Sequence, residues 1–150
     1  MEWIIVFIKS WILLYLLVDL KRLKVNIWCG VLAVALQIAI DTRAISRGWY
    51  HINRKGISIL GSSLFFTLGP VLVIGILMAQ YHPRKRWLRI VNVFVISALY
   101  SIFELFVLAR EALVYLDWSH IDSLVVNTCV MAVLSWFIIV VLDKKGGANT

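Results

Sequence analysis

Long, uninterrupted apolar stretches constrain this chain more than any other feature of its sequence. They occupy residues 3–19, 25–41, 57–80, 87–109 and 121–142. A hydrocarbon core of ~30 Å is crossed by ~20 apolar residues in helical form, because an α-helix rises ~1.5 Å per residue. The last three stretches reach that length and the first two come close. The sequence therefore predicts an integral membrane protein in which residues 1–150 form a single transmembrane domain.

The composition indicates the same class. Apolar residues make up 62% of the chain and charged residues 15%, whereas an ordinary soluble domain has about 45–50% and ~25%. Backbone polar groups in lipid are satisfied only within helices or closed barrels. Barrel strands are ~10-residue segments of alternating polarity, and the stretches here are longer and continuously apolar. We therefore expect an all-α fold, an integral membrane bundle of about five transmembrane helices.

The first stretch is the weakest of the five. Lys9 interrupts it, and only a short apolar run follows before the next charge. It does not resemble a signal peptide, because Glu2 stands where a basic region is expected and no small-residue cleavage site follows. Residues 3–19 therefore either cross the membrane, with Lys9 reaching the headgroups, or lie flat at the interface and leave four spans. We favour the span because of its length.

The net charge of +7 is concentrated in the connections between the apolar stretches. Basic clusters beside spans are typical of contact with anionic headgroups, so the expected partner is the lipid bilayer and not nucleic acid. One side carries nine basic residues, in residues 21–24, 84–89 and 144–145. The other carries five, in residues 43–55 and at Arg110. The more basic side faces the cytoplasm, so we expect a multi-pass cell-membrane protein with its N-terminus outside and its C-terminus inside.

Polar residues within the expected spans fall on helical faces. In the span 87–109 four of them follow i, i+3, i+4, i+7 spacing, and in the last span Ser123, Asn127 and Ser135 share a face. Polar faces turned towards lipid are costly, so we expect these faces to meet inside the bundle. The expected membrane-embedded polar cluster consists of Ser97, Tyr100, Ser101, Glu104, Ser123 and Asn127.

Glu104 is the strongest functional candidate in the sequence. A charged carboxylate in the hydrocarbon costs several kcal/mol unless it is paired or takes up a proton. In the functional interpretation Glu104 accepts a proton or binds a cation. In the structural interpretation it only holds helices together, through Tyr100, Asn127 or Arg110. One carboxylate alone makes no proton relay, so the sequence leaves both interpretations open and favours the second.

The second and third spans carry further polar residues. Gln37 and Asp41 lie four residues apart, with Asp41 at the end of its span. Pro70 lies in the middle of residues 57–80, where the lost hydrogen bond predicts a kink, and Thr67 or Ser63 can bond the freed carbonyl. Such a kink serves either as a transport hinge or only for packing. The paired broken helices that indicate a secondary transporter do not occur in this sequence.

The remaining candidates have simpler interpretations. A possible set of ligands for a divalent cation lies between the last two spans, at Asp117, His120 and Asp122. Their spacing matches no established metal site, so we expect a solvated loop and no metal. Cys29 and Cys129 lie in spans and show no disulfide or metal spacing. Five aromatic residues near the ends of spans are expected to form an interfacial belt: Trp3, Trp49, Tyr50, Tyr115 and Trp118.

One family resemblance concerns residues 83–123. The sequence YHPRKRW at residues 81–87 leads into the span with Tyr100 and Glu104, and YLDW at 115–118 precedes Ser123. This order resembles an uncharacterised family of small multi-pass membrane proteins of Gram-positive, spore-forming bacteria, known only by a locus-tag label. The resemblance implies a helical protein of the cell envelope and no particular activity. The positions that match the recurring residues of that family are Tyr100, Glu104, Trp118 and Ser123.

Two classes of function follow from these residues. The first is a non-enzymatic structural or partner-binding membrane component, whose partners include a second copy of the chain or another membrane protein. The alternative is a small proton- or cation-coupled transporter or channel that uses Glu104. We expect no enzyme, no cofactor and no identifiable small-molecule ligand, because catalysis requires a second titratable group beside Glu104. Asp41 is the nearest candidate of that kind, and it lies at a span end.

Overall fold

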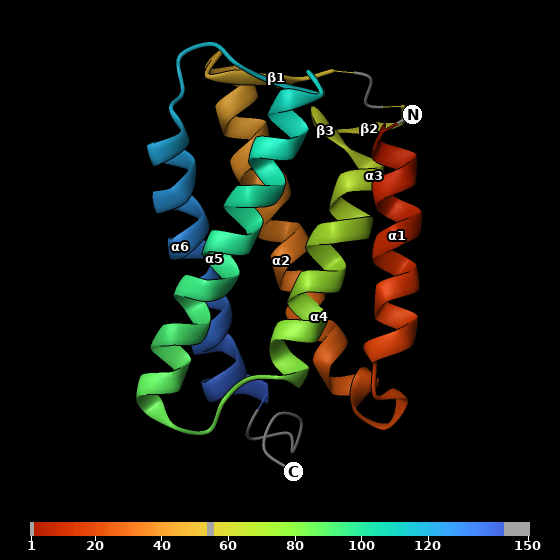
Figure 1. Cartoon of the computed structure of the whole chain (residues 1–150), viewed down its shortest axis with the longest axis vertical. Helices are drawn as coiled ribbons and strands as arrows, with labels where there is room; N and C mark the ends of the chain where they lie inside the picture. Colours follow the sequence, from red (N-terminus) through yellow and green to blue (C-terminus); the bar gives the residue numbers. More distant parts are fainter. Residues whose placement is uncertain (1, 54–55, 143–150) are drawn as a thin grey trace.

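The computed structural model describes residues 2–53 and 56–142 and is mostly helical. Its elements are α1 (Glu2–Leu17), α2 (Leu20–Ser46), β1 (Tyr50–Ile52), β2 (Ser58–Ile59), β3 (Ser62–Ser63), α3 (Leu64–Phe66), the π-helical turn η1 (Thr67–Val71), α4 (Leu72–Gln80), α5 (Arg86–Ala109), β4 (Leu113–Tyr115), α6 (His120–Phe137) and the π-helical turn η2 (Ile138–Leu142). Consecutive helical segments run antiparallel along one long axis (Figure 1). The predicted helical architecture is therefore observed, with four short strands added.

Three helical segments in the described part of the chain are long and apolar enough to cross a membrane: Leu20–Ser46, Arg86–Ala109 and His120–Leu142. Two shorter apolar helices, Trp3–Leu17 and Leu64–Gln80, complete the bundle. Large apolar side chains cover its outside, among them Leu99, Ile102 and Ile121, which are each at least 60% exposed. An apolar surface of this extent is typical of a membrane-associated protein.

Two helices differ in extent from the expected spans. The helix within residues 57–80 begins only at Leu64, because β2 and β3 form a hairpin through Leu60 and Gly61, which have φ angles of 48° and 93°. The helix within residues 25–41 extends to Leu20–Ser46. Asp19 caps its start by accepting a hydrogen bond from the Lys21 amide, so the basic run continues the helix instead of preceding it.

The expected kink at Pro70 takes the form of the π-helical turn η1. Proline cannot donate the helical hydrogen bond, and a wider turn is one way in which a helix accommodates the loss. The Thr67 hydroxyl donates to the carbonyls of Ser63 and Leu64, at 3.1 and 3.2 Å. Thr67 therefore satisfies carbonyl groups before the kink, and α3, η1 and α4 continue as one irregular helix.

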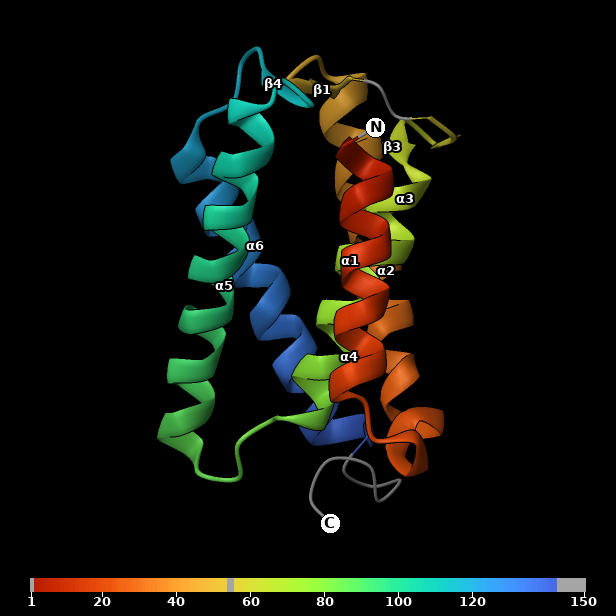
Figure 2. The same ribbon diagram turned by 45° about the vertical axis from the view of Figure 1, so that its right-hand side comes forward.

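The helices pack as two groups that α6 and a strand pair connect. α2 packs closely on α4, and α1 covers η1 and α4, whereas α5 packs mainly on α6. In Figure 2, α5 stands apart from α1, α2 and α4, whereas α6 crosses towards α2 and α4 at the end opposite the ribbon. At the end where the chain begins, β1 pairs antiparallel with β4, with Tyr50 opposite Tyr115 and Ile52 opposite Leu113. This two-stranded ribbon joins the connection after α2 to the connection before α6.

Glycines allow the closest helix contact in the bundle. A Cβ atom on Gly75 of α4 would lie 2.7 Å from the Cα atom of Gly30 in α2 and 3.0 Å from the Cβ atom of Ala33. Small residues at a crossing point let two membrane helices pack backbone to backbone. This contact fixes the position of α2, whose last turns carry Gln37 and Asp41 to the end of the bundle that holds the ribbon.

Candidate functional site

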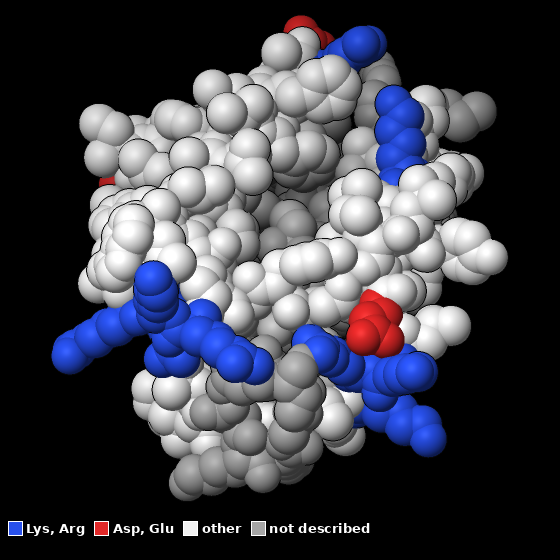
Figure 3. Space-filling model, turned by 60° about the horizontal axis from the view of Figure 1, so that its bottom comes forward, with Lys and Arg blue, Asp and Glu red and all other residues white. Residues whose placement is uncertain are grey.

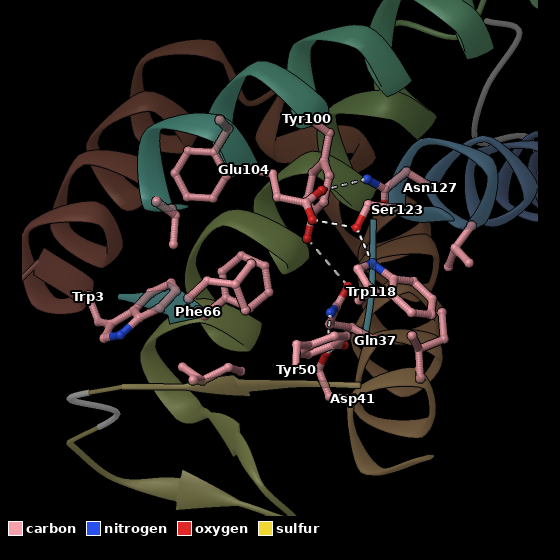
Figure 4. Close-up of a pocket in the computed structure, with 16 residues that line it drawn as sticks. Trp3, Gln37, Asp41, Tyr50, Phe66, Tyr100, Glu104, Trp118, Ser123 and Asn127 are labelled. Atoms are coloured by element: carbon pink, nitrogen blue, oxygen red, sulfur yellow. Dashed lines mark hydrogen bonds between the residues drawn. The ribbon is translucent and has the colours of Figure 1, made fainter. Parts of the chain in front are cut away.

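A polar cavity lies beneath the ribbon, between α2, α5 and α6 (Figure 4). Its volume is about 60 Å³. Two carboxylates and several phenol, indole, amide and hydroxyl groups reach it from these helices and from the two connections. We call it the dicarboxylate pocket. Its polar and aromatic lining residues are Trp3, Gln37, Asp41, Tyr50, Phe66, Tyr100, Phe103, Glu104, Trp118, Ser123 and Asn127.

Glu104 accepts hydrogen bonds from three neutral donors. The Ser123 hydroxyl donates to its Oε1 at 2.5 Å, and the Asn127 amide donates to its Oε2 at 3.2 Å. The Tyr115 hydroxyl also donates to Oε1. Ser123 is oriented in turn by Trp118, whose indole N–H donates to the serine oxygen at 2.6 Å. An acceptor-only carboxylate fits this set of donors, and the set ties α5 to β4 and α6.

Asp41 forms a second network on the opposite wall. Its Oδ1 accepts hydrogen bonds from the Tyr50 hydroxyl at 2.6 Å and from the Gln37 amide at 2.8 Å. The residue is 1% exposed. Its Oδ2 has no hydrogen bond of good geometry among the described residues, although the Ser62 hydroxyl interacts with the same carboxyl group. Asp41 therefore retains acceptor capacity inside the protein.

The two networks approach each other through Tyr100. Its hydroxyl donates a long hydrogen bond of 3.4 Å to the Oε1 atom of Gln37, which itself bonds Asp41. Glu104 and Asp41 line the same cavity, so negative charge on one group would oppose negative charge on the other. No lysine, arginine or histidine is found among the described residues that line the pocket. Two acidic groups therefore face one small cavity whose described lining contains no basic side chain.

Burial and the nearby carboxylates both raise the pKa of the two tyrosines of the ribbon. Burial, followed by the charge of Asp41, raises the pKa of Tyr50 above its ordinary value. Burial and the hydrogen bond to Glu104 raise the pKa of Tyr115 in the same direction. Both phenols therefore keep their protons at neutral pH and act as fixed donors to the carboxylates.

Aromatic rings form much of the remaining wall. Phe66 stacks on Phe103 with their ring centroids 6.2 Å apart, and Tyr100 lies 6.2 Å from Phe103. Trp3 is 3% exposed, and its indole donates to the Asn53 carbonyl at 2.9 Å. The interfacial belt was therefore the wrong interpretation for Trp3 and Tyr50, because their polar atoms have protein partners and their rings are buried in the pocket wall.

The expected polar cluster is only partly assembled. Ser123 and Asn127 both donate to Glu104. Tyr100 lines the same pocket but donates to Gln37 instead of Glu104. Arg110 is not placed as a partner of Glu104, since its guanidinium lies 5.3 Å from the centre of the Phe106 ring. The hydroxyls of two further members are buried away from these partners and have no hydrogen bond within the described chain: Ser97 and Ser101.

Several residues of the pocket were missed by the sequence analysis. Asp41 was set aside as a span end, although its spacing from Gln37 is that of a helical hydrogen-bonded pair. Tyr115 and Trp118 were assigned to the lipid interface. The family resemblance, by contrast, had pointed to Tyr100, Glu104, Trp118 and Ser123, and all four line the pocket.

The loop that contains Asp117, His120 and Asp122 forms no metal-ligand cluster in the described chain. No group of three or more His, Cys, Asp or Glu side chains that could hold a metal occurs there. Asp122 instead completes a capping box at the start of α6, where its carboxylate accepts from the amide of Ser119 at 2.9 Å. Cys29 and Cys129 are free cysteines.

Comparisons with known proteins give no relative for this chain: no family model, no curated protein and no solved structure matches it.

Proposed function

We propose that the chain crosses the cell membrane five times, once with each helical segment. The ribbon supports this topology, because it pairs the connection after α2 with the connection before α6 at one end of the bundle. Five antiparallel crossings would put both connections on the same side. The short segments Trp3–Leu17 and Leu64–Gln80 measure roughly 22–26 Å at ~1.5 Å per residue, and a bilayer adapts to such a mismatch by thinning locally.

In this topology the N-terminus lies outside and the C-terminus in the cytoplasm. Seven basic residues of the described chain lie around the end opposite the ribbon, in residues 21–24 and 84–89, against three at the ribbon end. Their side chains project around that end in Figure 3. Arg54, Lys55, Lys144 and Lys145, which also entered the count from the sequence, lie outside the described residues. The positive-inside rule then assigns the basic end to the cytoplasm.

A labelling experiment tests this topology. Single cysteines replace Arg47 at the ribbon end and Arg86 at the basic end, both exposed, in a chain whose two natural cysteines are changed to alanine. A membrane-impermeant maleimide applied to intact cells should label only the cysteine at position 47. Labelling at position 86 alone would reverse the orientation, and labelling at neither or both positions would contradict it.

For the function, the geometry favours cation binding over packing alone. In this proposal the protein binds a proton or a small cation in the dicarboxylate pocket, as a cation-coupled carrier or channel does. The observation that carries it is the pair Asp41 and Glu104, which face one cavity with no basic residue in its described lining. Negative charge on both groups at once would be unfavourable in a medium of low dielectric, because like charges repel. A bound positive charge would relieve this repulsion.

The second candidate is a structural membrane component, favoured by the saturation of Glu104. Its carboxylate already accepts three hydrogen bonds, which join α5 to β4 and α6. If packing were its only task, Glu104→Gln would preserve the fold and the biological role, since an amide still accepts hydrogen bonds through one oxygen. In the cation-binding proposal, the same change keeps the fold and abolishes binding.

Infrared spectroscopy of the protein in lipid vesicles separates the two candidates. We would record isotope-edited carboxyl absorption from about pH 4 to about pH 9, with Glu104→Gln and Asp41→Asn to assign the bands. The exposed Glu111, changed to Gln, is the matched control. We expect a pocket carboxyl band that changes with pH or added cation and is missing in one of the two pocket variants. Carboxyl bands that respond to neither would refute cation binding and leave the packing role.

The family relationship is part of this proposal. We would place the chain with the small multi-pass membrane proteins that it resembles, because the four recurring positions of that pattern converge on one pocket. The relationship carries no activity to this chain, so the function rests on the pocket alone.

A further inference from the structure

Aromatic rings surround the two carboxylates of the dicarboxylate pocket. Trp3, Phe66, Tyr100, Phe103 and Trp118 all contribute to its lining, next to Asp41 and Glu104. Building on the proposed function, we infer that the bound cation is a small organic ammonium ion. Aromatic faces attract such cations through the ring quadrupole, and carboxylates supply the opposite charge.

The donor set argues against a metal ion. Hard divalent cations take six or more oxygen ligands, and softer ones take imidazole or thiolate. Neither histidine nor cysteine lines the pocket in the described chain, and Glu104 is already occupied by three hydrogen-bond donors. A metal would have to displace these donors. An ammonium ion needs no inner shell of oxygens, since it binds through charge and through contact with the rings.

A bare proton does not account for the shape of the site. A proton shared between two carboxylates requires only that they touch, whereas the structure keeps a cavity of about 60 Å³ between their networks. One water needs roughly 10–15 Å³ of such space, so the cavity admits a group larger than a single water. Asp41 lines this cavity and is 1% exposed, so its carboxyl group is a buried acceptor for an ammonium N–H, beside its bonds to Tyr50 and Gln37.

The lining also excludes the opposite charge. An anion would meet two carboxylates without a basic partner in the described lining, and a neutral apolar molecule would leave both charges uncompensated. A continuous aromatic wall is formed by Phe66, Phe103 and Tyr100, whose ring centroids lie 6.2–6.3 Å apart. A cation with an alkyl surface matches both parts of the pocket.

Fluorescence provides the test, because Trp3 and Trp118 line the pocket and report on its occupancy. The full chain in lipid vesicles would be titrated with methylammonium and with tetramethylammonium. Potassium chloride supplies the same charge without an alkyl surface, and tert-butanol supplies a similar shape without charge. We expect a saturable change with at least one ammonium ion and none with potassium or tert-butanol.

Variants tie the signal to the site. Asp41→Asn and Glu104→Gln should each weaken ammonium binding at least about tenfold, since each removes one unit of opposite charge. Phe103→Leu removes one ring without touching a hydrogen bond and should weaken binding several-fold, about threefold or more. Phe94→Leu, on the exposed face of the same helix, is the matched control and should leave binding unchanged.

The outcomes separate this inference from the proposed function. A response to potassium or to pH with none to either ammonium ion would overturn the ammonium inference and keep cation binding. Ammonium binding that is unchanged in Asp41→Asn and in Glu104→Gln would place the ion outside the dicarboxylate pocket. That result would also overturn the ammonium inference. No response to any cation or to pH would refute both. Circular dichroism of each variant checks that the helices remain formed.

Discussion

Two buried serines on neighbouring helices allow the strength of the Glu104 network to be measured with one kind of substitution. The Ser123 hydroxyl donates to Glu104 at 2.5 Å and accepts from the Trp118 indole at 2.6 Å. Ser123→Ala removes both bonds and the 3.0 Å contact between the Ser123 and Tyr115 hydroxyls. Side-chain hydrogen bonds between membrane helices contribute ~0.6 kcal/mol on average and up to ~1.7 kcal/mol. The loss should therefore be about 1–3 kcal/mol.

Ser97→Ala is the matched comparison. Ser97 is 1% exposed, and its hydroxyl has no hydrogen-bond partner among the described residues. The change from a hydroxymethyl to a methyl side chain removes an unsatisfied, desolvated hydroxyl and no hydrogen bond. We expect a change in the free energy of unfolding of less than about 0.5 kcal/mol, or a small stabilisation. The two serines differ in their partners and hardly in their burial.

Unfolding in mixed detergent micelles, followed by tryptophan fluorescence and by circular dichroism, gives both free energies. Glu104→Gln and the double variant with Ser123→Ala complete a thermodynamic cycle and isolate the Ser123–Glu104 pair. The cycle should return a coupling of about 1 kcal/mol. Equal costs for Ser97→Ala and Ser123→Ala, or a coupling near zero, would refute the idea that this network holds α5 on α6.

Three further predictions concern packing, pH and the aromatic wall. Gly75→Ala should destabilise the protein by about 1–3 kcal/mol, measured by the same unfolding assay, because the new Cβ atom meets Gly30 Cα at 2.7 Å. Burial, and then Arg89, lower the pKa of His82 from 6.5 to about 4, so the fold favours neutral imidazole. We therefore expect full thermal stability above pH 6.5. The stability should fall by at most about 2 kcal/mol, after solvent screening, as the pH drops through 4. His82→Asn should flatten this pH profile. Trp3→Phe should cost about 1–2 kcal/mol in the unfolding assay, because it removes the bond to the Asn53 carbonyl.

The helical architecture was predictable because it depends on composition and length alone. Continuous apolar stretches leave few alternatives in lipid, and the helices found here follow the predicted stretches within a few residues at most ends. The exception, residues 57–63, contains Leu60 and Gly61 in left-handed conformations that turn the chain into a hairpin. Hydropathy does not respond to backbone conformation, so an apolar hairpin and an apolar helix give the same signal.

The site was predictable only on the helices that carry a regular polar face. Spacing within α5 and α6 indicated Glu104, Ser123 and Asn127, and the last two both donate to Glu104. The partners from the ribbon were missed, because Tyr50 and Tyr115 come from different connections and meet only through strand pairing. Aromatic residues at span ends have the same sequence signature whether they face lipid or a pocket.

The π-helical turn η1 has a consequence for the phase of the helix in which it lies. A π turn holds one residue more than an α turn, and each residue advances an α-helix by ~100°. The faces before and after Thr67–Val71 are therefore rotated against each other. Phe66 is thereby turned towards Phe103 and the pocket, while Gly75 is turned towards Gly30 of α2. Deletion of Pro70 would remove both the extra residue and the missing donor, but only one of these two contacts would then keep its register.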